Sequence, residues 1–463
     1  MSSASLTQPG CASLRDGRAQ RSPLPDAHRS PVSPPPPKDS FAPKEVPPAL
    51  KALRSTLDRQ DAWRSTTLNL IASENVLSPA ARLALDSDLV HRYAEGHPGA
   101  RYYEGTRFVD VIEADASAAC RRVFRCGWAD VRPISGTVSN EAVFSRLVPR
   151  GATVIAHKVA TGGHISHDRM GALGKRTDRI LPWPTLEDGY RIDVSAAKDL
   201  LLAEKPVVAV LGRSLFLFPE PVAELAEAAR AAGTRLLYDG AHVLGLIAGG
   251  TFQDPLHEGA DVLMGSTHKT YFGPQRGVVL TRGDDEALRT AVDKGVFPGS
   301  SSNHHLHSLP SLLVATLEME AFGAAYAKDV VRNAQALGAA LSRRGLSVAC
   351  ADLGFTRSHQ VVLDVGASGG GREVAARLSQ DDVITNMNLL PGEPGKSAMN
   401  PRGIRMGVQE LTRFGMGVVE MEEVARLLDE AIVHRKPVAP DVHRLRARFP
   451  TIRYGFEAHD FAR

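Results

Sequence analysis

The sequence has few cysteines, little net charge and no long apolar segment. Its four cysteines (Cys11, Cys120, Cys126 and Cys350) lack the spacing of a metal site, and they are typical of reduced thiols rather than of a disulfide framework. A formal net charge of +3 over 463 residues gives no electrostatic reason to expect nucleic-acid binding. No apolar run approaches the roughly 18 residues that would span a bilayer, and the N-terminus lacks the apolar core of a secretory signal. We therefore expect a cytoplasmic protein with no nucleic-acid, membrane or metal partner.

Proline is concentrated near the N-terminus. Residues 22–38 are rich in proline and poor in large apolar side chains, so burial there cannot offset the entropy lost on ordering. We predict a disordered tail over residues 1–48, more simply a passive extension than a ligand for a proline-binding domain. The remaining chain, in a sequence that is 43% hydrophobic, can bury a large core. We predict a large domain over residues 49–345 and a small C-terminal domain with its tail over residues 346–463.

Short apolar runs alternate with helical patterns between residues 130 and 280. The runs that fit buried parallel strands lie at residues 151–157, 206–212, 235–239 and 261–264. Between the second and third runs, apolar residues from Val222 to Ala229 share one helical face and Gly233 ends the helix. A long helical stretch follows over residues 308–345. Repeated strand–helix units predict an α/β fold in which helices cover both faces of a large, mostly parallel sheet.

Lys269 and Asp239 follow two of these predicted strands. Ligands bind at the carboxyl ends of parallel strands, so both side chains should enter one crevice. A lone lysine in the run Ser266-Thr-His-Lys-Thr270 would usually be an ordinary surface residue. The pair, however, matches the needs of pyridoxal 5′-phosphate (PLP), because a lysine amine forms a Schiff base with its aldehyde and a carboxylate keeps its pyridine nitrogen protonated.

Other residues fit the same cofactor and an amino acid substrate. The segment Ile134–Ala142 contains Ser135, Gly136 and Thr137 where a helix should begin, which suits a phosphate, although a plain helix cap explains it equally well alone. His164 could stack on the cofactor ring, or be a buried histidine bonded to backbone. Arg405 could bind a substrate carboxylate or form a structural salt bridge. Glu95 could transfer protons, or be a solvated surface residue.

Six segments together resemble serine hydroxymethyltransferases across residues 65–435. The segments are Ile71–Asn75, Tyr93–Tyr103, Gly162–His164, Asp239–His242, Ser266–Thr270 and Gly403–Arg405. The resemblance implies the aminotransferase-like fold of PLP fold-type I enzymes, with an active site shared across a homodimer or a dimer of dimers. It implies that Lys269 carries PLP, Asp239 bonds the pyridine nitrogen, His164 stacks on the ring and Arg405 binds the amino acid carboxylate.

The resemblance also implies further contacts. Residues expected to touch the cofactor are Ser135, Gly136, Thr137, Ser214, His242, His268, Ser302 and Asn303. Tyr93, Glu95 and Tyr103 are expected to reach the site from the neighbouring subunit. Tyr93, Tyr103 and Ser73 are expected near the substrate, and Glu95 and His164 are expected to take part in catalysis with Lys269 and Asp239. The last two cofactor residues, Ser302 and Asn303, are expected to meet the partner subunit's phosphate.

Three segments depart from the usual hydroxymethyltransferase pattern. After the lysine, the usual turn Gly-Pro-Arg-Gly-Gly is here Gly273-Pro-Gln-Arg-Gly277. The usual phosphate loop Phe-Pro-Gly-x-Gln-Gly-Gly-Pro is here Phe297-Pro-Gly-Ser-Ser-Ser-Asn-His304. The usual Gly-Thr-Pro-Ala is here Gly407-Val-Gln-Glu410. These variants resemble the threonine transaldolases of specialised metabolism, including antibiotic biosynthesis. The expected reaction is retro-aldol cleavage of L-threonine to acetaldehyde, followed by addition of the glycyl carbanion to a second aldehyde, such as a nucleoside 5′-aldehyde.

Two alternatives stay open. One is a folate-dependent serine or α-methylserine hydroxymethyltransferase, since Gly162, Gly163 and Asn388 occupy positions where the family contacts folate. The other is a catalytically silent protein that binds partners through its proline-rich tail. The combination of Lys269, Asp239 and Arg405 argues against the silent protein, which has no physical need for all three.

Overall fold

The computed structural model describes residues 45–393 and 398–462. The chain divides into two units between Arg59 and Gln60, and helix α1 spans Pro48–Thr66. Residues 1–44 of the predicted proline-rich tail lie outside the described residues, so that prediction stays untested. All features of the candidate site belong to the second unit.

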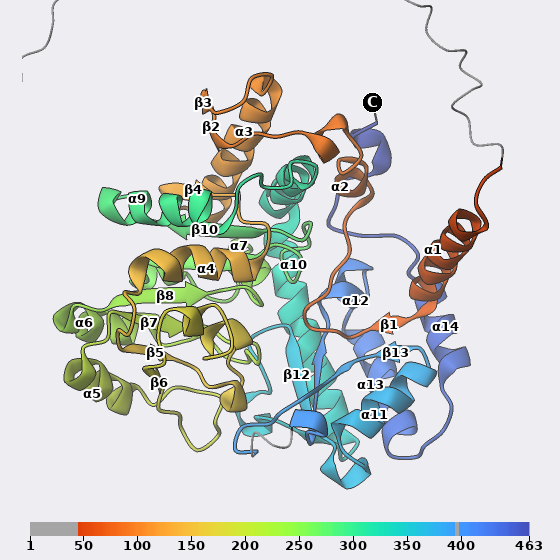
Figure 1. The fold of residues 1–463 in the computed structure, drawn as a ribbon. Helices are drawn as coiled ribbons and strands as arrows, with labels where there is room; N and C mark the ends of the chain where they lie inside the picture. Colours follow the sequence, from red (N-terminus) through yellow and green to blue (C-terminus); the bar gives the residue numbers. More distant parts are fainter. Residues whose placement is uncertain (1–44, 394–397, 463) are drawn as a thin grey trace, which may run out of the picture. The chain divides into compact units, whose positions relative to one another are not determined.

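The largest sheet among the described residues of the second unit has seven strands (Figure 1). In spatial order its strands are β4 (Trp128–Asp130), β10 (Gly277–Thr281), β9 (Val262–Ser266), β8 (Arg235–Asp239), β7 (Val208–Leu211), β5 (Val154–Ala156) and β6 (Ile180–Pro182). Strand β10 runs antiparallel to both neighbours, and the strands from β9 to β6 pair in parallel. The predicted α/β fold with a large, mostly parallel sheet is confirmed.

Helices cover both faces of this sheet, and alternate strand residues explain why. Along β8, Leu236 and Tyr238 pack into one core cluster, whereas Leu237 packs into another on the opposite face. The first cluster includes residues from α3 (Arg107–Phe124), α5 (Val194–Glu204), α6 (Val222–Ala232), α7 (Leu244–Ala248) and α10 (Ser308–Arg343). The second includes residues from α4 (Gly136–Leu147) and α9 (Glu286–Lys294). Helix α6 ends at Gly233 with φ 72°, as its sequence predicts.

A smaller antiparallel sheet follows in the sequence. Its spatial order is β11 (Ser347–Val348), β12 (Gln360–Asp364), β15 (Gly403–Gly407) and β14 (Asn386–Asn388). The two-residue strands β1 (Leu68–Asn69) and β13 (Val383–Ile384) pair in parallel, and β2 (Gly96–His97) pairs antiparallel with β3 (Ala100–Arg101). The remaining α-helices of the described residues are α2 (Pro79–Leu83), α8 (Pro255–Glu258), α11 (Gly371–Gln380), α12 (Gln409–Arg413), α13 (Val418–Ile432) and α14 (Ala439–Ala447). The two larger sheets lie on either side of residue 345 in the sequence, and the domain boundary predicted there stays a prediction.

The long helix α10 packs against α3 and α13. It spans 36 residues and matches the helical stretch predicted from residue 308. Polar side chains interrupt it, and none of the helices in the described part of the chain combines the length and apolarity needed to cross a membrane.

The contact between α7 and the loop after β9 leaves no room for a side chain at Gly245. A Cβ atom there would lie 2.1 Å from the carbonyl oxygen of Thr270, the residue after Lys269. We predict that Gly245→Ala destabilises the fold by at least about 2 kcal/mol, because packed backbone must move. Gly233→Ala is the matched control, since it meets no atom within 4 Å and should cost about 1 kcal/mol for its left-handed backbone. Urea unfolding measures both, and equal costs would contradict this close packing.

Candidate active site

Asp239 and Lys269 lie at the same edge of the main sheet. Asp239 is the last residue of β8, and Lys269 follows the end of the adjacent parallel strand β9 by three residues. Both are buried, with 5% and 8% of their surfaces exposed. The structure therefore places these two predicted site residues at neighbouring strand ends, as the sequence predicts.

Asp239 is a buried carboxylate with three donors. His167 Nε2 lies 3.0 Å from its Oδ2, Asn140 Nδ2 donates to the same oxygen at 2.7 Å, and the backbone N–H of Ala241 donates to Oδ1 at 3.0 Å. Burial alone would raise the pKa of Asp239, but the His167 hydrogen bond and charge, with the Asn140 bond, hold it well below its usual range. The carboxylate stays charged at neutral pH, as a partner for a pyridinium nitrogen must.

The pKa of Lys269 is also lowered, which in an amine favours the neutral form. Burial lowers the pKa of its amine to about 8, with the charge of Asp239 opposing that shift and the charge of Arg405 adding to it. A sizeable fraction of the amine is therefore neutral near pH 8 and able to attack an aldehyde. Its backbone is fixed as well, since Asn75 Nδ2 donates to the Lys269 carbonyl oxygen at 2.8 Å. Ser73, a predicted substrate residue, lies two positions before Asn75.

The ring of His164 has a defined tautomer. The backbone N–H of Ser166 donates to His164 Nδ1 at 3.2 Å, and Ser166 Oγ lies 2.7 Å from the same nitrogen. Burial lowers the pKa of His164 to about 4, so the ring is neutral and its proton is on Nε2. Because Asn140 donates to Ser166 Oγ at 2.9 Å, one amide links the positions of His164 and Asp239.

Arg405 is a buried cation without a carboxylate partner in the described part of the chain. Its NH1 donates to the Ser214 carbonyl oxygen at 2.8 Å, and its Nε and NH2 lie 3.4 and 3.3 Å from Asn386 Oδ1. Burial lowers the pKa of the guanidinium to about 10, which still leaves it charged. The salt bridge considered as the alternative role is therefore absent here, and the guanidinium is free to bind an added carboxylate.

The N-terminus of α4 faces the loop that carries Lys269. Ser135 is the N-cap, and its Oγ accepts a hydrogen bond from the N–H of Val138, so the structural capping role is real. A Cβ atom at Gly136 would lie 2.9 Å from Ser266 Cβ, which shows how closely the helix start approaches the end of β9. Ser266 Oγ and His268 Nδ1 are buried without a hydrogen-bond partner among the described residues. Together with Thr137, these groups fit the phosphate of PLP at a helix N-terminus.

His242 and Ser214 complete the group of predicted residues around Lys269. The ring of His242 stacks on His359 with centroids 5.8 Å apart, and Gln360 Nε2 lies 3.1 Å from His242 Nδ1. Gln360 also donates to the Ser214 carbonyl oxygen at 3.0 Å, the same oxygen that Arg405 contacts. Burial, followed by the charges of Lys269 and Arg405, holds the pKa of His242 well below its usual value, so this ring carries no charge.

The structure does not bring the other predicted residues to Lys269 within one chain. Tyr93 and Tyr103 are 53% and 45% exposed, and their rings lie 5.5 Å apart. The Glu95 carboxylate has no hydrogen-bond or ion-pair partner among the described residues. Ser302 is exposed, and the Asn303 side chain bonds to the backbone of Arg92 and Ala94. Their predicted contacts across a dimer stay predictions.

Sequence reasoning missed His167, Asn140 and Gln360. Asn140 lies inside the segment Ile134–Ala142, and His167 lies three residues after the segment Gly162–His164; both segments were singled out for other residues. Gln360 lies in β12, more than a hundred positions from its partners His242 and Ser214. No local pattern signals a contact of that sequence separation.

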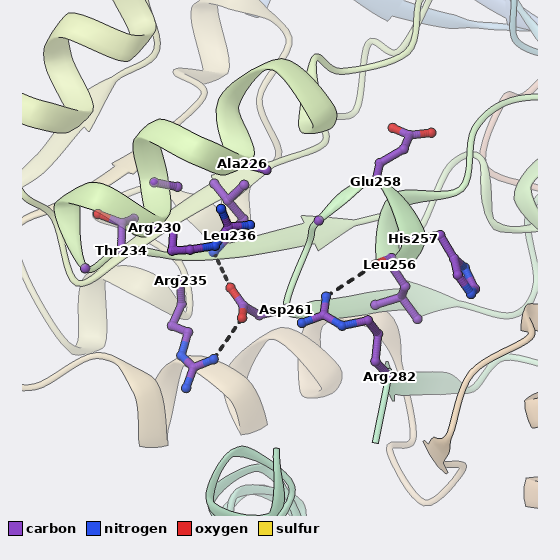
Figure 2. Close-up of a pocket in the computed structure, with 13 residues that line it drawn as sticks. Ala226, Arg230, Thr234, Arg235, Leu236, Leu256, His257, Glu258, Asp261 and Arg282 are labelled. Atoms are coloured by element: carbon purple, nitrogen blue, oxygen red, sulfur yellow. Dashed lines mark hydrogen bonds and ion pairs between the residues drawn. The ribbon is translucent and has the colours of Figure 1, made fainter. Parts of the chain in front are cut away.

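A separate cavity of about 550 Å³ lies near the opposite ends of the same strands (Figure 2). Arg235, which begins β8, lines it and pairs with Asp261 and Asp285 at 2.8 and 2.6 Å. Because these carboxylates already satisfy its guanidinium, Arg235 has no free charge for an anionic ligand. The cavity is not part of the Lys269 site.

Comparison with known proteins identifies a family, close relatives in sequence and a similar solved structure. The family model described as serine hydroxymethyltransferase matches residues 48–428. The serine hydroxymethyltransferase of Methanothermobacter thermautotrophicus is 46% identical over 405 residues, covering 88% of this chain and 95% of the relative. That of Pyrobaculum neutrophilum is 47% identical over 418 residues, covering 89% and 96%. A crystal structure of L-threonine transaldolase from Pseudomonas fluorescens in internal aldimine state superposes with a TM-score of 0.81 at 28% identity, covering 89% of this chain and 94% of that one.

The pKa of Lys269 gives a test of its assignment as the cofactor lysine. Covalent capture of PLP by the apoprotein should speed up as pH rises toward about 8 and level off above it, because only the neutral amine attacks. Borohydride trapping followed by peptide mass spectrometry measures the captured fraction at Lys269. Lys269→Ala should keep the circular dichroism spectrum of the parent but trap no PLP. Trapping on another lysine, or an undiminished yield in that variant, would contradict the assignment.

Proposed function

We propose that this chain, which belongs to the serine hydroxymethyltransferase family and is a PLP-dependent transferase acting on amino acids, transfers a hydroxymethyl group between serine and a reduced folate. The family and the cofactor follow from relatives at 46% and 47% identity that cover almost nine-tenths of the chain. The choice of serine and folate is the proposal.

The carboxylate-free Arg405 is the observation that carries the substrate assignment. A buried guanidinium bonded only to a carbonyl oxygen and an amide oxygen is unusual, because burial of an unpaired charge is costly. A substrate carboxylate would pair with it. Arg405 is close enough to Lys269 for the guanidinium charge to lower the pKa of the amine, which supports one α-amino acid contacting both residues.

The chain's own groups define the chemistry around the cofactor. PLP supplies an electron sink for the electrons released at the amino acid's α-carbon. Asp239 holds a negative charge where the ring nitrogen would lie, and the neutral ring of His164 can lie against the cofactor without adding a positive charge. The N-terminus of α4 offers N–H groups and hydroxyls to the phosphate. Glu95, from a second subunit, is our candidate for moving a proton on the substrate hydroxyl.

Two of the residues predicted to contact folate, Asn388 and Gly162, are connected to Arg405 through neighbouring residues, which supports the folate reaction. Asn388 is two positions from Asn386 on β14, so their side chains share one face of the strand, and Asn386 contacts Arg405. The carbonyl oxygen of Gly162 accepts hydrogen bonds from the N–H groups of Ser214 and Leu215. The Ser214 carbonyl oxygen in turn contacts Arg405.

A threonine transaldolase is the second candidate, favoured by the TM-score of 0.81 and by the three departures from the usual motifs. The structure gives those departures packing roles. Arg276 is fully buried and bonded to His304, and Gln409 Nε2 donates to the carbonyl oxygens of Ile71 and Glu74 at 2.7 Å. Packing roles carry no preference for an acceptor aldehyde. With 28% identity to the transaldolase against 46% and 47% to the hydroxymethyltransferases, the folate reaction is the better supported.

We also propose a homodimer, or a dimer of dimers, in which each subunit completes the other's site. Within the described residues no contact joins Tyr93, Glu95 or Tyr103 to Lys269, Asp239 or Arg405. Exposed aromatic side chains such as Tyr93 and Tyr103 suit an interface. A second subunit would supply these groups to the pocket.

Asp239→Asn should keep PLP bound but lower turnover on the order of a hundredfold or more, since a neutral amide no longer favours the charged ring. The matched control is Asp261→Asn, which alters a carboxylate at the opposite edge of the sheet, near the cavity in Figure 2. It should retain near-parental turnover. Steady-state kinetics on both variants measures this, and a parental rate for Asp239→Asn would mean that another group keeps the ring nitrogen protonated.

The two candidate reactions can be distinguished by their co-substrates, tetrahydrofolate for one and a second aldehyde for the other. Serine with tetrahydrofolate should give glycine at a rate that depends on folate, and Asn388→Ala should raise the KM for folate while leaving PLP bound. Threonine with a panel of aldehydes should release little acetaldehyde in a coupled dehydrogenase assay. Acetaldehyde release that strictly requires a second aldehyde, with no folate-dependent glycine formation, would replace the proposal with the transaldolase reaction.

A further inference from the structure

Two residues that depart from the usual family pattern contact each other. Arg276 stands where the usual Gly-Pro-Arg-Gly-Gly turn has its second glycine, and His304 stands where the phosphate loop usually has proline. Arg276 NH2 lies 3.1 Å from His304 Nδ1, and Arg276 NH1 donates to the His304 carbonyl oxygen at 2.8 Å. They are separated by 28 positions in the sequence, and both are buried, with 0% and 2% of their surfaces exposed.

Neutral acceptors surround the Arg276 guanidinium. NH1 donates also to the carbonyl oxygen of His305 at 3.0 Å and to Ser308 Oγ at 2.8 Å. Nε and NH2 donate to the carbonyl oxygen of Val131 at 3.3 and 2.8 Å. The rigid fork of arginine thus joins the 304–308 segment to the chain that follows β4, an arrangement that a lysine ammonium cannot reproduce.

The backbone of Arg276 is hydrogen-bonded to the loop that carries Lys269. Its carbonyl oxygen accepts from the N–H of Thr267 at 2.9 Å, and its N–H lies 3.2 Å from Thr267 Oγ1. Thr267 is two positions before Lys269. One residue therefore contacts the loop that presents the cofactor lysine and also fixes the segment that follows Ser302 and Asn303.

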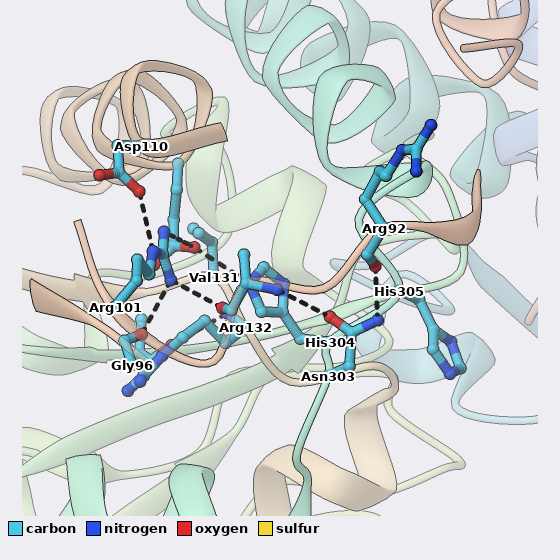
Figure 3. A network of polar contacts seen from close by, with 12 residues as sticks. Arg92, Gly96, Arg101, Asp110, Val131, Arg132, Asn303, His304 and His305 are labelled. Carbon is cyan, nitrogen blue, oxygen red and sulfur yellow. Dashed lines mark hydrogen bonds and ion pairs between the residues drawn. The ribbon is translucent and has the colours of Figure 1, made fainter. Parts of the chain in front are cut away.

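His304 extends this contact toward the Tyr93–Tyr103 segment (Figure 3). His304 Nε2 lies 3.0 Å from Glu113 Oε2, and Arg101 NH2 donates to the same carboxylate oxygen at 2.8 Å. Arg101 NH1 then donates to the carbonyl oxygens of Ala94 and Gly96 at 2.9 and 2.8 Å, on either side of Glu95.

Asn303 closes the connection from the other side. Its Nδ2 donates to the carbonyl oxygen of Arg92 at 2.8 Å, and its Oδ1 accepts from the N–H of Ala94 at 3.3 Å (Figure 3). The side chain that is expected to face the partner subunit's phosphate is thus bonded to the segment expected to supply Glu95. Both segments are thus connected by polar contacts to the buried Arg276, with the close approach of His304 to Glu113 as the link to Arg101.

We infer that Arg276 and His304 are positioning residues, which together fix the Ser302–Asn303 turn and the Glu95 segment of one subunit for delivery to the PLP site of a partner subunit. This inference rests on the proposed shared site but is independent of which acceptor reaction the enzyme performs. Neither residue needs to touch the cofactor or the substrate.

The first test measures PLP retention in Arg276→Lys and His304→Leu. Each should weaken PLP binding at least about tenfold, because bonds from a buried cation are lost and the partner-facing turn is released. His304→Asn should restore most of the affinity, since its amide oxygen can accept from Arg276 where Nδ1 does. Arg413→Lys is the matched control, because Arg413 is equally buried but bonds to Glu318 and Tyr454. It should lower thermal stability without releasing PLP.

The second test asks whether the effect crosses the interface. Subunits carrying Lys269→Ala keep Arg276 and its contacts, and subunits carrying Arg276→Lys keep Lys269. In a hybrid dimer, the site that contains Lys269 therefore receives the Ser302–Asn303 turn and the Glu95 segment from the subunit with intact Arg276. Differently tagged chains are co-expressed, hybrids are purified, and PLP per dimer is measured by absorbance after dialysis. We expect one PLP per hybrid, held as tightly as in the parent.

Hybrids that lose PLP as Arg276→Lys homodimers do, a chain without a second subunit, or parental PLP affinity in both single variants would overturn the inference. None of these readouts involves serine, threonine or folate. Loss of the proposed hydroxymethyl transfer would therefore leave the test intact, and the two failures can be told apart.

Discussion

The hydrogen bond between His167 and Asp239 is the contact on which the rest of the site depends. A carboxylate buried at the end of β8 would otherwise become neutral, because burial raises its pKa. His167 and Asn140 keep it charged, and Asn140 also bonds Ser166, which fixes the ring of His164. The charge of Asp239 in turn opposes the desolvation of Lys269 and leaves its amine with a pKa of about 8. One small polar cluster thus keeps Asp239 charged, orients the ring of His164 and limits the fall in the pKa of Lys269.

The departures from the family's usual motifs become intelligible once their contacts are known. Arg276 and His304 occupy separate motifs in the sequence, yet they bond directly, so they count as one coupled change rather than two. Gln409 holds the 71–74 segment, which leads to Asn75 and the Lys269 carbonyl oxygen. These roles explain why the chain can differ from the pattern at several places while its relatives remain hydroxymethyltransferases. They also weaken the sequence-based argument for a transaldolase, because the variant residues have packing roles that do not depend on the acceptor substrate.

The sequence predicted correctly those features that depend on residues close together in the chain. Apolar runs bounded by breakers located β8 at Arg235–Asp239 and β9 near Val262–Ser266, and the rule that ligands bind at strand ends then paired Asp239 with Lys269. The sequence left two roles open for Arg405, binding of a substrate carboxylate or a structural salt bridge. Because Arg405 has no carboxylate partner among the described residues, the structure favours the first role. The contacts of His167, Gln360 and Arg276 could not be predicted, because they join positions far apart in the chain and depend on the register of several elements. The contacts expected across a dimer join residues of two chains, so a single chain does not contain them.

The central claim is that Asp239, kept anionic by His167, keeps the cofactor's pyridine nitrogen protonated. Nuclear magnetic resonance on enzyme loaded with pyridine-¹⁵N-labelled PLP reads that protonation state directly. A chemical shift in the protonated range in the parent, moving toward the neutral range in His167→Phe, is the result that our account predicts. A neutral ring nitrogen in the parent enzyme, or a protonated one that is unaffected by the loss of His167, would contradict it.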